Sequence, residues 1–208
     1  MKIAPFDYRA VWRWHFYAGL FCIPFIVLLS ITGSIYLFKP QIEAALDRPY
    51  DGLRLTAPTA GAGRQVLAAL AAVPGGQLDA YELPVRANDA ARVIVRDATG
   101  EAQRVYVHPQ TLQVLAVVPE RDRPMQVIKR IHGELLMGDG GSIAVELAAS
   151  WAIVMIVTGL YLWWPRKERA ATARFAGILY PRLRASGRTF WRDLHAVTGV
   201  WVSVLALF

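Results

Sequence analysis

The feature that most constrains the fold is an uncharged run of 23 residues at positions 16–38. As an α-helix, rising about 1.5 Å per residue, this run is long enough to cross the ~30 Å hydrocarbon core of a bilayer. It is also longer than the apolar region of a signal peptide, which usually spans about 7–15 residues. It ends at Phe38-Lys39-Pro40 and not at the small residues of a cleavage site. We therefore predict a retained transmembrane helix that begins at His15 and ends near Phe38.

Two further apolar segments lie near the end of the chain. Residues 143–164 carry a single charge, Glu146, and are long enough for a second transmembrane helix. They close with two tryptophans followed by Arg166 and Lys167, which is typical of the cytoplasmic end of a membrane helix. Residues 195–208 are apolar but too few to span, so we expect only the start of a third helix. The fold class expected is a mainly α membrane protein, a transmembrane helix bundle in the lipid bilayer.

The net charge of +7 is unevenly distributed, and its distribution predicts the topology. Residues 1–15 carry three basic residues against one acidic residue, and residues 166–193 carry eight against two. The segment 39–146 carries 12 basic and 13 acidic residues and is nearly neutral. Basic residues beside membrane spans mark the cytoplasmic side. We therefore expect a cytoplasmic N-terminus, an external 40–123 segment and a basic cytoplasmic loop at 166–194. No nucleic-acid recognition motif accompanies the basic residues, so we expect no nucleic-acid partner.

The segment between the first two membrane helices is predicted to be a small α+β domain. One helix is expected at residues 64–73, and strands at 78–85, 92–97, 103–108 and 112–118. Neither a glycine-rich phosphate loop nor a nucleophile–base pair occurs in it, so it does not indicate catalysis. Residues 124–137 favour an interfacial helix containing His132, followed by a glycine break and a cap at Ser142. The five regions expected are 1–39, 40–123, 124–165, 166–194 and 195–208.

Three of the four histidines stand at ends of membrane segments. His15 opens the first helix and His195 the third, so alternating topology places both on the cytoplasmic face, while His132 lies on the outer side. Histidines at membrane depth usually face the bundle interior and mark a cofactor or a transport path. Two facing imidazoles suit the axial positions of a haem iron. Zinc is the competing metal, but it prefers about four ligands, of which Asp193 could supply one.

Four residues near these histidines suit a haem. Gly19 and Gly199 follow their histidines by one helical turn and would leave room for a flat macrocycle. Arg13 and Arg192 precede them and could bind the propionates through charge-assisted hydrogen bonds. The single cysteine, Cys22, lies in the first apolar run, where a small buried residue is the ordinary interpretation.

These histidine segments resemble a known family. The segments that carry the resemblance are 13–19 (RWHFYAG), 131–136 (IHGELL), 158–166 (TGLYLWWPR) and 191–199 (WRDLHAVTG), together with 105–115 (VYVHPQTLQVL). Over nearly the whole chain they resemble the PepSY-associated transmembrane proteins, which are bacterial iron-regulated inner-membrane proteins. Segment 105–115 is similar to the strand–turn–strand of a PepSY domain, with His108 where that pattern more often has aspartate. Family members are usually longer, so we expect this chain to be the N-terminal part of a longer protein.

The resemblance implies membrane electron transfer during iron uptake. Some relatives are haem-containing reductases of ferric siderophores. For this chain the resemblance implies haem b as the cofactor, with two haem groups in a full-length protein. His15 and His195 would ligate one haem iron and His132 the other. The electron donor would be a partner reductase or quinol, since no flavin or nicotinamide motif is present. Oxygen-rich siderophores favour Fe(III), so reduction would release the metal. The alternative is a non-enzymatic, membrane-anchored PepSY module whose sheet edge binds a protein or peptide.

Overall fold

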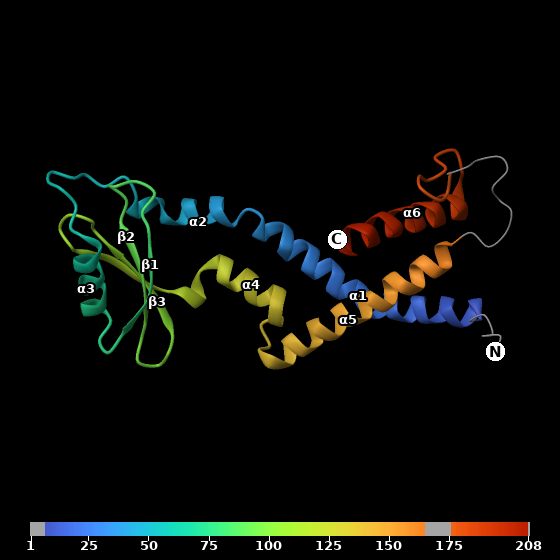
Figure 1. The fold of residues 1–208 in the computed structure, drawn as a ribbon, viewed down its shortest axis with the longest axis horizontal. Coiled ribbons are helices and arrows are strands. Elements are labelled where there is room, and N and C mark those ends of the chain that lie inside the picture. Colours follow the sequence, from blue (N-terminus) through green and yellow to red (C-terminus); the bar gives the residue numbers. More distant parts are fainter. Residues whose placement is uncertain (1–6, 165–175, 208) are drawn as a thin grey trace. The chain divides into compact units, whose positions relative to one another are not determined.

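The computed structural model describes residues 7–164 and 176–207 (Figure 1). The chain forms two compact units. We call the described part of residues 1–28 and 139–208 the helical unit, and residues 29–138 the sheet unit. The long helix α1, Tyr8–Tyr36, passes from the first unit into the second. The fold is mostly helical with a four-stranded antiparallel sheet inserted between two long apolar helices, so the predicted fold class is confirmed.

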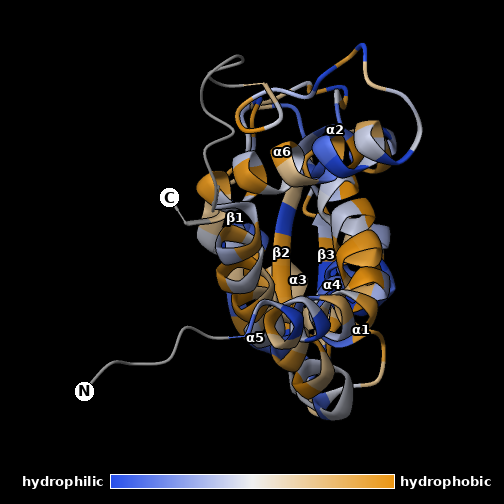
Figure 2. Ribbon diagram, turned by 90° about the vertical axis from the view of Figure 1, so that its right-hand side faces the viewer, coloured by the Kyte–Doolittle hydropathy of each residue, from blue (hydrophilic) through white to orange (hydrophobic). Residues whose placement is uncertain are grey.

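Within residues 7–164 and 176–207, two helices are long and apolar enough to cross a membrane, α1 and α5, Asp139–Trp163. Figure 2 shows their hydrophobic character. Most of their apolar side chains are not covered by the protein itself; Leu20 is 62% exposed and Ile153 is 64% exposed. A soluble core helix would bury such residues, whereas lipid tails can cover them. Both predicted transmembrane helices are therefore present and suited to a bilayer.

Helices α1 and α5 pack antiparallel within the helical unit. Cys22 Sγ approaches the Ala148 carbonyl at 3.7 Å, and Gly19 lies against Met155. His15, one turn of α1 before Gly19, meets Thr158. The buried residues Val11, Ala18 and Cys22 share one stripe of α1 with His15, at helical spacings of three and four. Small residues on this stripe allow close helix approach, as is common in membrane interfaces. Helix α6, Gly187–Leu207, packs against α5.

The sheet unit has strand order β1-β2-β3-β4, with all neighbours antiparallel. Its strands are β1, Gln77–Glu82; β2, Ala91–Arg96; β3, Ala102–Val107; and β4, Val114–Pro119. Alternate residues of β2 and β3 form the core with helix α3, Ala62–Ala72, which covers one face of the sheet (Figure 1). Val93, Val95 and Val105 in this core are completely buried. Period-two alternation thus accounts for the predicted strands, and the predicted helix is also present, all with bounds shifted by a few residues.

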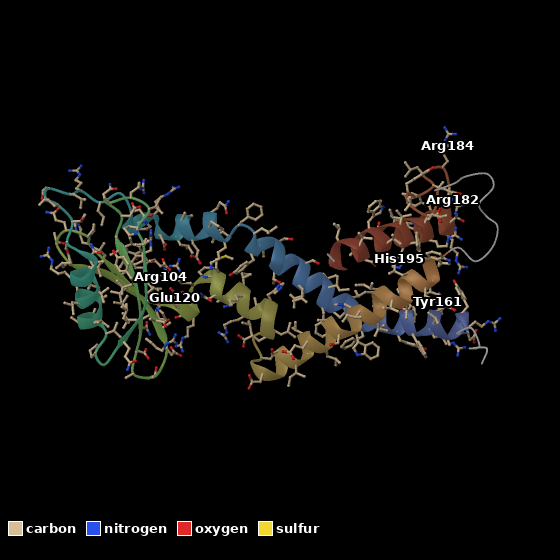
Figure 3. The ribbon with its side chains drawn as sticks, in the orientation of Figure 1. Arg104, Glu120, Tyr161, Arg182, Arg184 and His195 are labelled. Atoms are coloured by element: carbon tan, nitrogen blue, oxygen red, sulfur yellow. The ribbon has the colours of Figure 1, made fainter. Side chains whose placement is uncertain are left out.

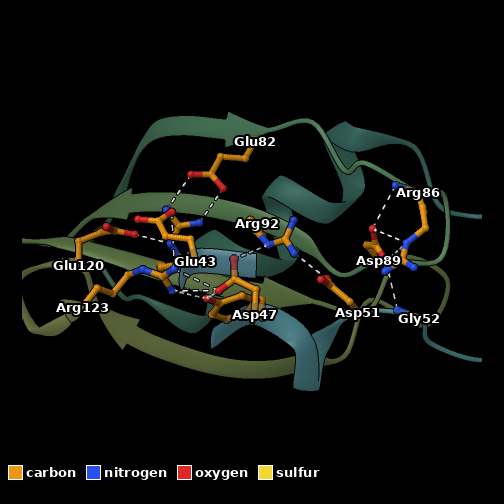
Figure 4. Close-up of polar contacts among 12 residues, drawn as sticks. Glu43, Asp47, Asp51, Gly52, Glu82, Arg86, Asp89, Arg92, Glu120 and Arg123 are labelled. Atoms are coloured by element: carbon orange, nitrogen blue, oxygen red, sulfur yellow. Dashed lines mark hydrogen bonds and ion pairs between the residues drawn. The ribbon is translucent and has the colours of Figure 1, made fainter. Parts of the chain in front are cut away.

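The opposite face of the sheet carries buried charge (Figure 4). Asp47, at the end of helix α2 (Lys39–Asp47), accepts hydrogen bonds from Tyr106 and Arg123 and pairs with Arg92. Arg104 forms two hydrogen bonds with Glu82 and one with Glu120. Burial, followed by the hydrogen bond to Asp47, raises the pKa of Tyr106 above its ordinary range. Arg92, Arg104 and Tyr106 on β2 and β3 are therefore part of a second, polar buried layer of the sheet unit.

Several helix starts differ from the sequence expectation. Helix α1 begins at Tyr8 and α6 at Gly187, so both include residues expected in a tail or loop. His195 is therefore an interior helical residue and not the first of its helix. Helix α5 begins at Asp139, where an acidic first turn favours the helix dipole, and Ser142 hydrogen-bonds Glu146 instead of capping. Charged residues such as Arg9 and Arg192 are good helix formers, which is why hydropathy alone placed these starts too late.

Two short helices complete the sheet unit. Helix α2 was not predicted, because Lys39-Pro40 resembles the end of a helix, yet proline also suits the first helical turn. The expected interfacial helix is α4, Pro124–Glu134, which ends at Leu135 in a left-handed conformation. Of the basic loop expected at 166–194, residues 165–175 lie outside the described residues. In the described remainder, Gly177 donates to the Tyr180 carbonyl, and the indoles of Trp163 and Trp201 bind the carbonyls of Ile178 and Leu179.

Candidate histidine site

His15 lies half-buried on the face of α1 that packs against α5. Its Nδ1 is 3.0 Å from the Thr158 hydroxyl. That hydroxyl is also 2.6 Å from the Val154 carbonyl, which can only accept a hydrogen bond. If the threonine proton goes to Val154, the hydroxyl oxygen accepts from a protonated Nδ1 of His15. In this tautomer Nε2 carries a free lone pair, as a metal ligand requires.

His195 of α6 lies beside His15, as the sequence predicted. Figure 3 labels it among the side chains of α6. The two ring centroids are 6.2 Å apart and the ring planes are inclined by 72°. With metal–imidazole bonds of about 2 Å, two ligands on opposite sides of one ion would have ring centroids about 6 Å apart. The observed centroid separation matches this value, and His195 is exposed.

The two glycines expected beside a macrocycle differ from each other. A Cβ at Gly199 would meet no atom within 4 Å, so this position opens onto free space, as expected. A Cβ at Gly19 would lie 3.3 Å from the Met155 methyl, so a side chain of α5 occupies the space expected to be open. Gly19 therefore serves helix packing in this structure. A third glycine, Gly159, was not predicted: a Cβ there would lie 3.1 Å from His15 Cε1, so its lack of a side chain admits the imidazole ring.

The two arginines expected to bind propionates also differ. Arg13 is exposed and forms no ion pair within the part of the chain that the structure describes. Arg192 donates to the carboxylate of Asp193 at 2.9 Å, and Arg182 binds the same carboxylate at 2.6 and 3.0 Å. Asp193 is 2% exposed, and Gly177 packs directly against it, where any Cβ would lie 3.1 Å from its Oδ2. Arg192 thus already has a partner, and Arg13 is the freer cation.

His132 belongs to the sheet unit. Its Nδ1 is 2.8 Å from the Thr32 hydroxyl, which donates to the Leu29 carbonyl at 3.2 Å. Gly33 faces the ring, and a Cβ there would lie 3.6 Å from His132 Cε1. The His132 side chain is otherwise exposed. Its second ring nitrogen is therefore available for a ligand, as that of His15 is.

The donor set favours a two-ligand metal centre over zinc. Across residues 7–164 and 176–207, no three histidine, cysteine, aspartate or glutamate side chains gather as a metal site would require. Asp193, the one oxygen donor considered for zinc, is bound by Arg182 and Arg192. A haem iron, whose equatorial ligands come from its own macrocycle, needs from the protein only the two axial imidazoles. The imidazoles of His15 and His195 therefore match the number of donors that a haem iron takes from a protein.

The fold and these contacts define a class: a membrane protein of long apolar helices with an inserted sheet domain and a paired histidine site. The chain matches the PepSY-associated TM region family over residues 12–208 and belongs to that family. No curated protein matches the chain. Sequence patterns did not indicate Thr158, Thr32 or Gly159 as site residues. The available signal was the dipeptide Thr-Gly, which occurs in each of the three apolar helices.

Proposed function

We propose that this protein is a haem b-containing electron-transfer protein of the bacterial inner membrane that reduces ferric siderophores on the periplasmic side. The observation that carries the proposal is the approach of the His15 and His195 rings, whose centroids are 6.2 Å apart. The two histidines are 180 positions apart in the sequence. When bound, haem would supply one-electron redox chemistry. The residues of the chain would bind it, orient it and set its environment.

The roles of the chain's own residues follow from their contacts. His15 and His195 would supply the axial nitrogens, and Gly199 would leave space beside the macrocycle. Arg13 would bind a propionate, because it is exposed and forms no ion pair with the residues that the structure describes. His132 would ligate a second haem on the outer side. The electron donor would be a quinol or a partner reductase, and the substrate a ferric siderophore, from which reduction to Fe(II) favours release.

The test is the visible spectrum of the purified protein in detergent, oxidised and then reduced with dithionite. We expect a Soret band whose intensity falls when His15→Ala or His195→Ala is introduced. Because both residues would ligate one iron, the double variant should lose no more than either single variant. His132→Ala should leave this haem in place and remove a different one.

A matched control is His108→Ala, since this half-buried histidine belongs to a turn of the sheet unit. It should leave haem content unchanged. Unchanged haem content in His15→Ala and His195→Ala, with folded protein by circular dichroism, would contradict the proposal. Reduction of a ferric hydroxamate or catecholate complex by the dithionite-reduced protein, followed by Fe(II) chelation with ferrozine, then tests the substrate side.

A second function, binding of a protein or peptide, is favoured by one observation. Strand β1 is an edge of the sheet, and the apolar residues just after it, Leu83 and Val85, are 83% and 89% exposed. An edge strand presents unpaired backbone groups that an extended peptide can pair with. This function does not require a haem, so the visible spectrum separates the two proposals.

A further inference from the structure

Two histidines in separate units of the chain make the same set of contacts. His15 meets Thr158 and Gly159 of α5, and His132 meets Thr32 and Gly33 of α1. In each case Nδ1 approaches the threonine hydroxyl, at 3.0 and 2.8 Å, and Cε1 faces the glycine that follows. Each threonine hydroxyl also donates to a carbonyl of its own helix, three or four residues earlier. The recurrence links each histidine to a Thr-Gly pair on another helix.

The hydrogen-bond direction is the same at both places. A hydroxyl has one proton, and a backbone carbonyl can only accept it. When the threonine proton goes to that carbonyl, the oxygen is left to accept, and the imidazole then donates from Nδ1 and keeps its lone pair on Nε2. A hydrogen bond from the non-ligating nitrogen of a histidine also fixes the ring orientation and increases the donor strength of the other nitrogen.

The burial of the threonines distinguishes these contacts from ordinary helical hydroxyls. Thr158 is 7% exposed and Thr32 is 3% exposed, although both lie on helices whose outward faces suit lipid. Other hydroxyls of the same helices, Ser150 and Ser34, also donate to the carbonyl four residues earlier but are exposed and meet no histidine. The Thr198-Gly199 dipeptide of α6 is likewise exposed. Ser203 of α6 is also buried and donates to the Gly199 carbonyl, so contact with an imidazole, and not burial alone, distinguishes Thr158 and Thr32 among the described hydroxyls compared.

We propose that Thr158 and Thr32 are positioning residues that hold His15 and His132 as the Nδ1–H tautomer, with Nε2 free to bind a metal. The adjacent glycines, Gly159 and Gly33, provide the space for each ring. A methyl group at Gly159 would force the His15 ring to move, since the 3.1 Å approach is tighter than normal packing. This inference deepens the proposed function, because it assigns the hydrogen-bond partners of two haem ligands.

The tautomers are measurable in the haem-free protein, so this test does not depend on the proposed function. We would record ¹⁵N spectra of the chain labelled at histidine, in detergent micelles without haem, and assign the four histidines by single substitutions. His15 and His132 should be protonated at Nδ1. His108 supplies an internal reference of the opposite kind, because its Nδ1 accepts from the backbone N–H groups of Gln110 and Thr111 and its proton must lie on Nε2.

The variants then separate positioning from folding. Thr158→Val keeps the shape but removes the acceptor, so His15 should lose its Nδ1–H preference, while Thr158→Ser should retain it. Thr32→Val should do the same to His132 alone. Ser150→Ala and Ser34→Ala, on the same two helices, should change neither tautomer. With haem bound, Thr158→Val should raise the midpoint potential of the His15 haem, because a weaker ligand stabilises the ferric state less.

The outcomes decide between alternatives. A His15 or His132 proton on Nε2 in the unsubstituted protein would overturn the proposal, whether or not haem binds. So would Thr158→Val or Thr32→Val variants, helical by circular dichroism, whose histidine tautomers match the unsubstituted chain. An Nδ1–H tautomer in a protein that never takes up haem would support the positioning role and reject the proposed function.

Discussion

At the scale of single residues, His108 shows how one side chain can close a turn. Its Nδ1 accepts hydrogen bonds from the backbone N–H groups of Gln110 and Thr111, both at 3.2 Å. Leu112 then takes a positive φ of 65° as the chain enters β4. This is the acceptor geometry that an aspartate commonly supplies in turns. It agrees with the structural role expected for His108 and excludes it from the paired histidine site.

We expect His108→Ala to lower the free energy of opening of the sheet unit by about 1 kcal/mol, since it removes the acceptor of two turn hydrogen bonds. His108→Asp should retain most of that stability, because a carboxylate can accept the same bonds. Amide hydrogen exchange of β3 and β4 peptides in the intact chain measures the change. Gln113→Ala, at an exposed neighbouring position, is the control and should have little effect. Equal protection in His108→Ala and the control would contradict this role.

Asp47 is the residue on which the buried charges depend most. Its carboxylate meets Arg92, Arg123 and the hydroxyl of Tyr106, and all four residues are nearly inaccessible to water. Asp47→Ala would leave two buried guanidinium groups short of a counter-charge. Removing one partner of a buried ion pair typically costs about 3–5 kcal/mol.

We therefore expect Asp47→Ala to abolish slow hydrogen exchange in β2 and β3. The control is Asp79→Ala, whose ion pair with Arg96 is about half exposed and should contribute only about 0–1 kcal/mol. If both variants exchange at the rate of the unsubstituted chain, the buried network contributes little to the stability of the sheet unit.

At the scale of elements, the β2–β3 hairpin contains a pH-sensitive turn. The side-chain hydrogen bond from Thr99, followed by that from Gln103, lowers the pKa of Asp97 to about 2, from an ordinary 3.8. A carboxyl whose pKa is lower in the folded state stabilises the fold above its unfolded pKa, and this contribution is lost as the pH falls through the folded pKa. The turn should therefore be fully stabilised above about pH 4 and lose this contribution between about pH 4 and pH 2.

The measurement compares the chain with Asp97→Asn in thermal melts followed by far-ultraviolet circular dichroism. The melting difference should be present at pH 6 and shrink towards pH 2. Asp79→Asn, whose carboxylate faces solvent in an exposed ion pair, is the control for general effects of charge. A difference between Asp97→Asn and the unsubstituted chain that stays constant down to pH 2 would contradict the role of the carboxylate.

Elements with local patterns could be predicted from the sequence, and contacts between them could not. Alternating valines predicted β2 and β3, and the uncharged runs predicted α1 and α5, because each pattern depends only on neighbours in the chain. The approach of His15 to His195 followed from alternating topology. The Thr158 contact could not be predicted, since it depends on the rotation of α5 about its own axis. The burial of Arg92 likewise depends on a residue distant in the chain, because its partner Asp47 lies at the end of α2.

At the scale of the whole molecule, the charge distribution predicts which parts face the cytoplasm. The nearly neutral 39–146 segment contains the sheet unit's strands, whereas the residues after α5 are strongly basic. Positive loops are retained on the cytoplasmic side during insertion. This asymmetry is independent of the histidine contacts, so it can be tested even in protein that binds no haem.

Single cysteines placed on either side of the membrane test this topology. The only native cysteine, Cys22, is 1% exposed, and Cys22→Ala provides a thiol-free background. Val85→Cys, at a site 89% exposed, should react with a membrane-impermeant maleimide in intact spheroplasts. Ser186→Cys, exposed between α5 and α6, should react only after permeabilisation. Because a helix that crosses once reverses the side, the two sites must behave oppositely if α5 spans the bilayer. Labelling of both before permeabilisation would show that the two sites lie on the same side, and would contradict a single crossing of the bilayer by α5.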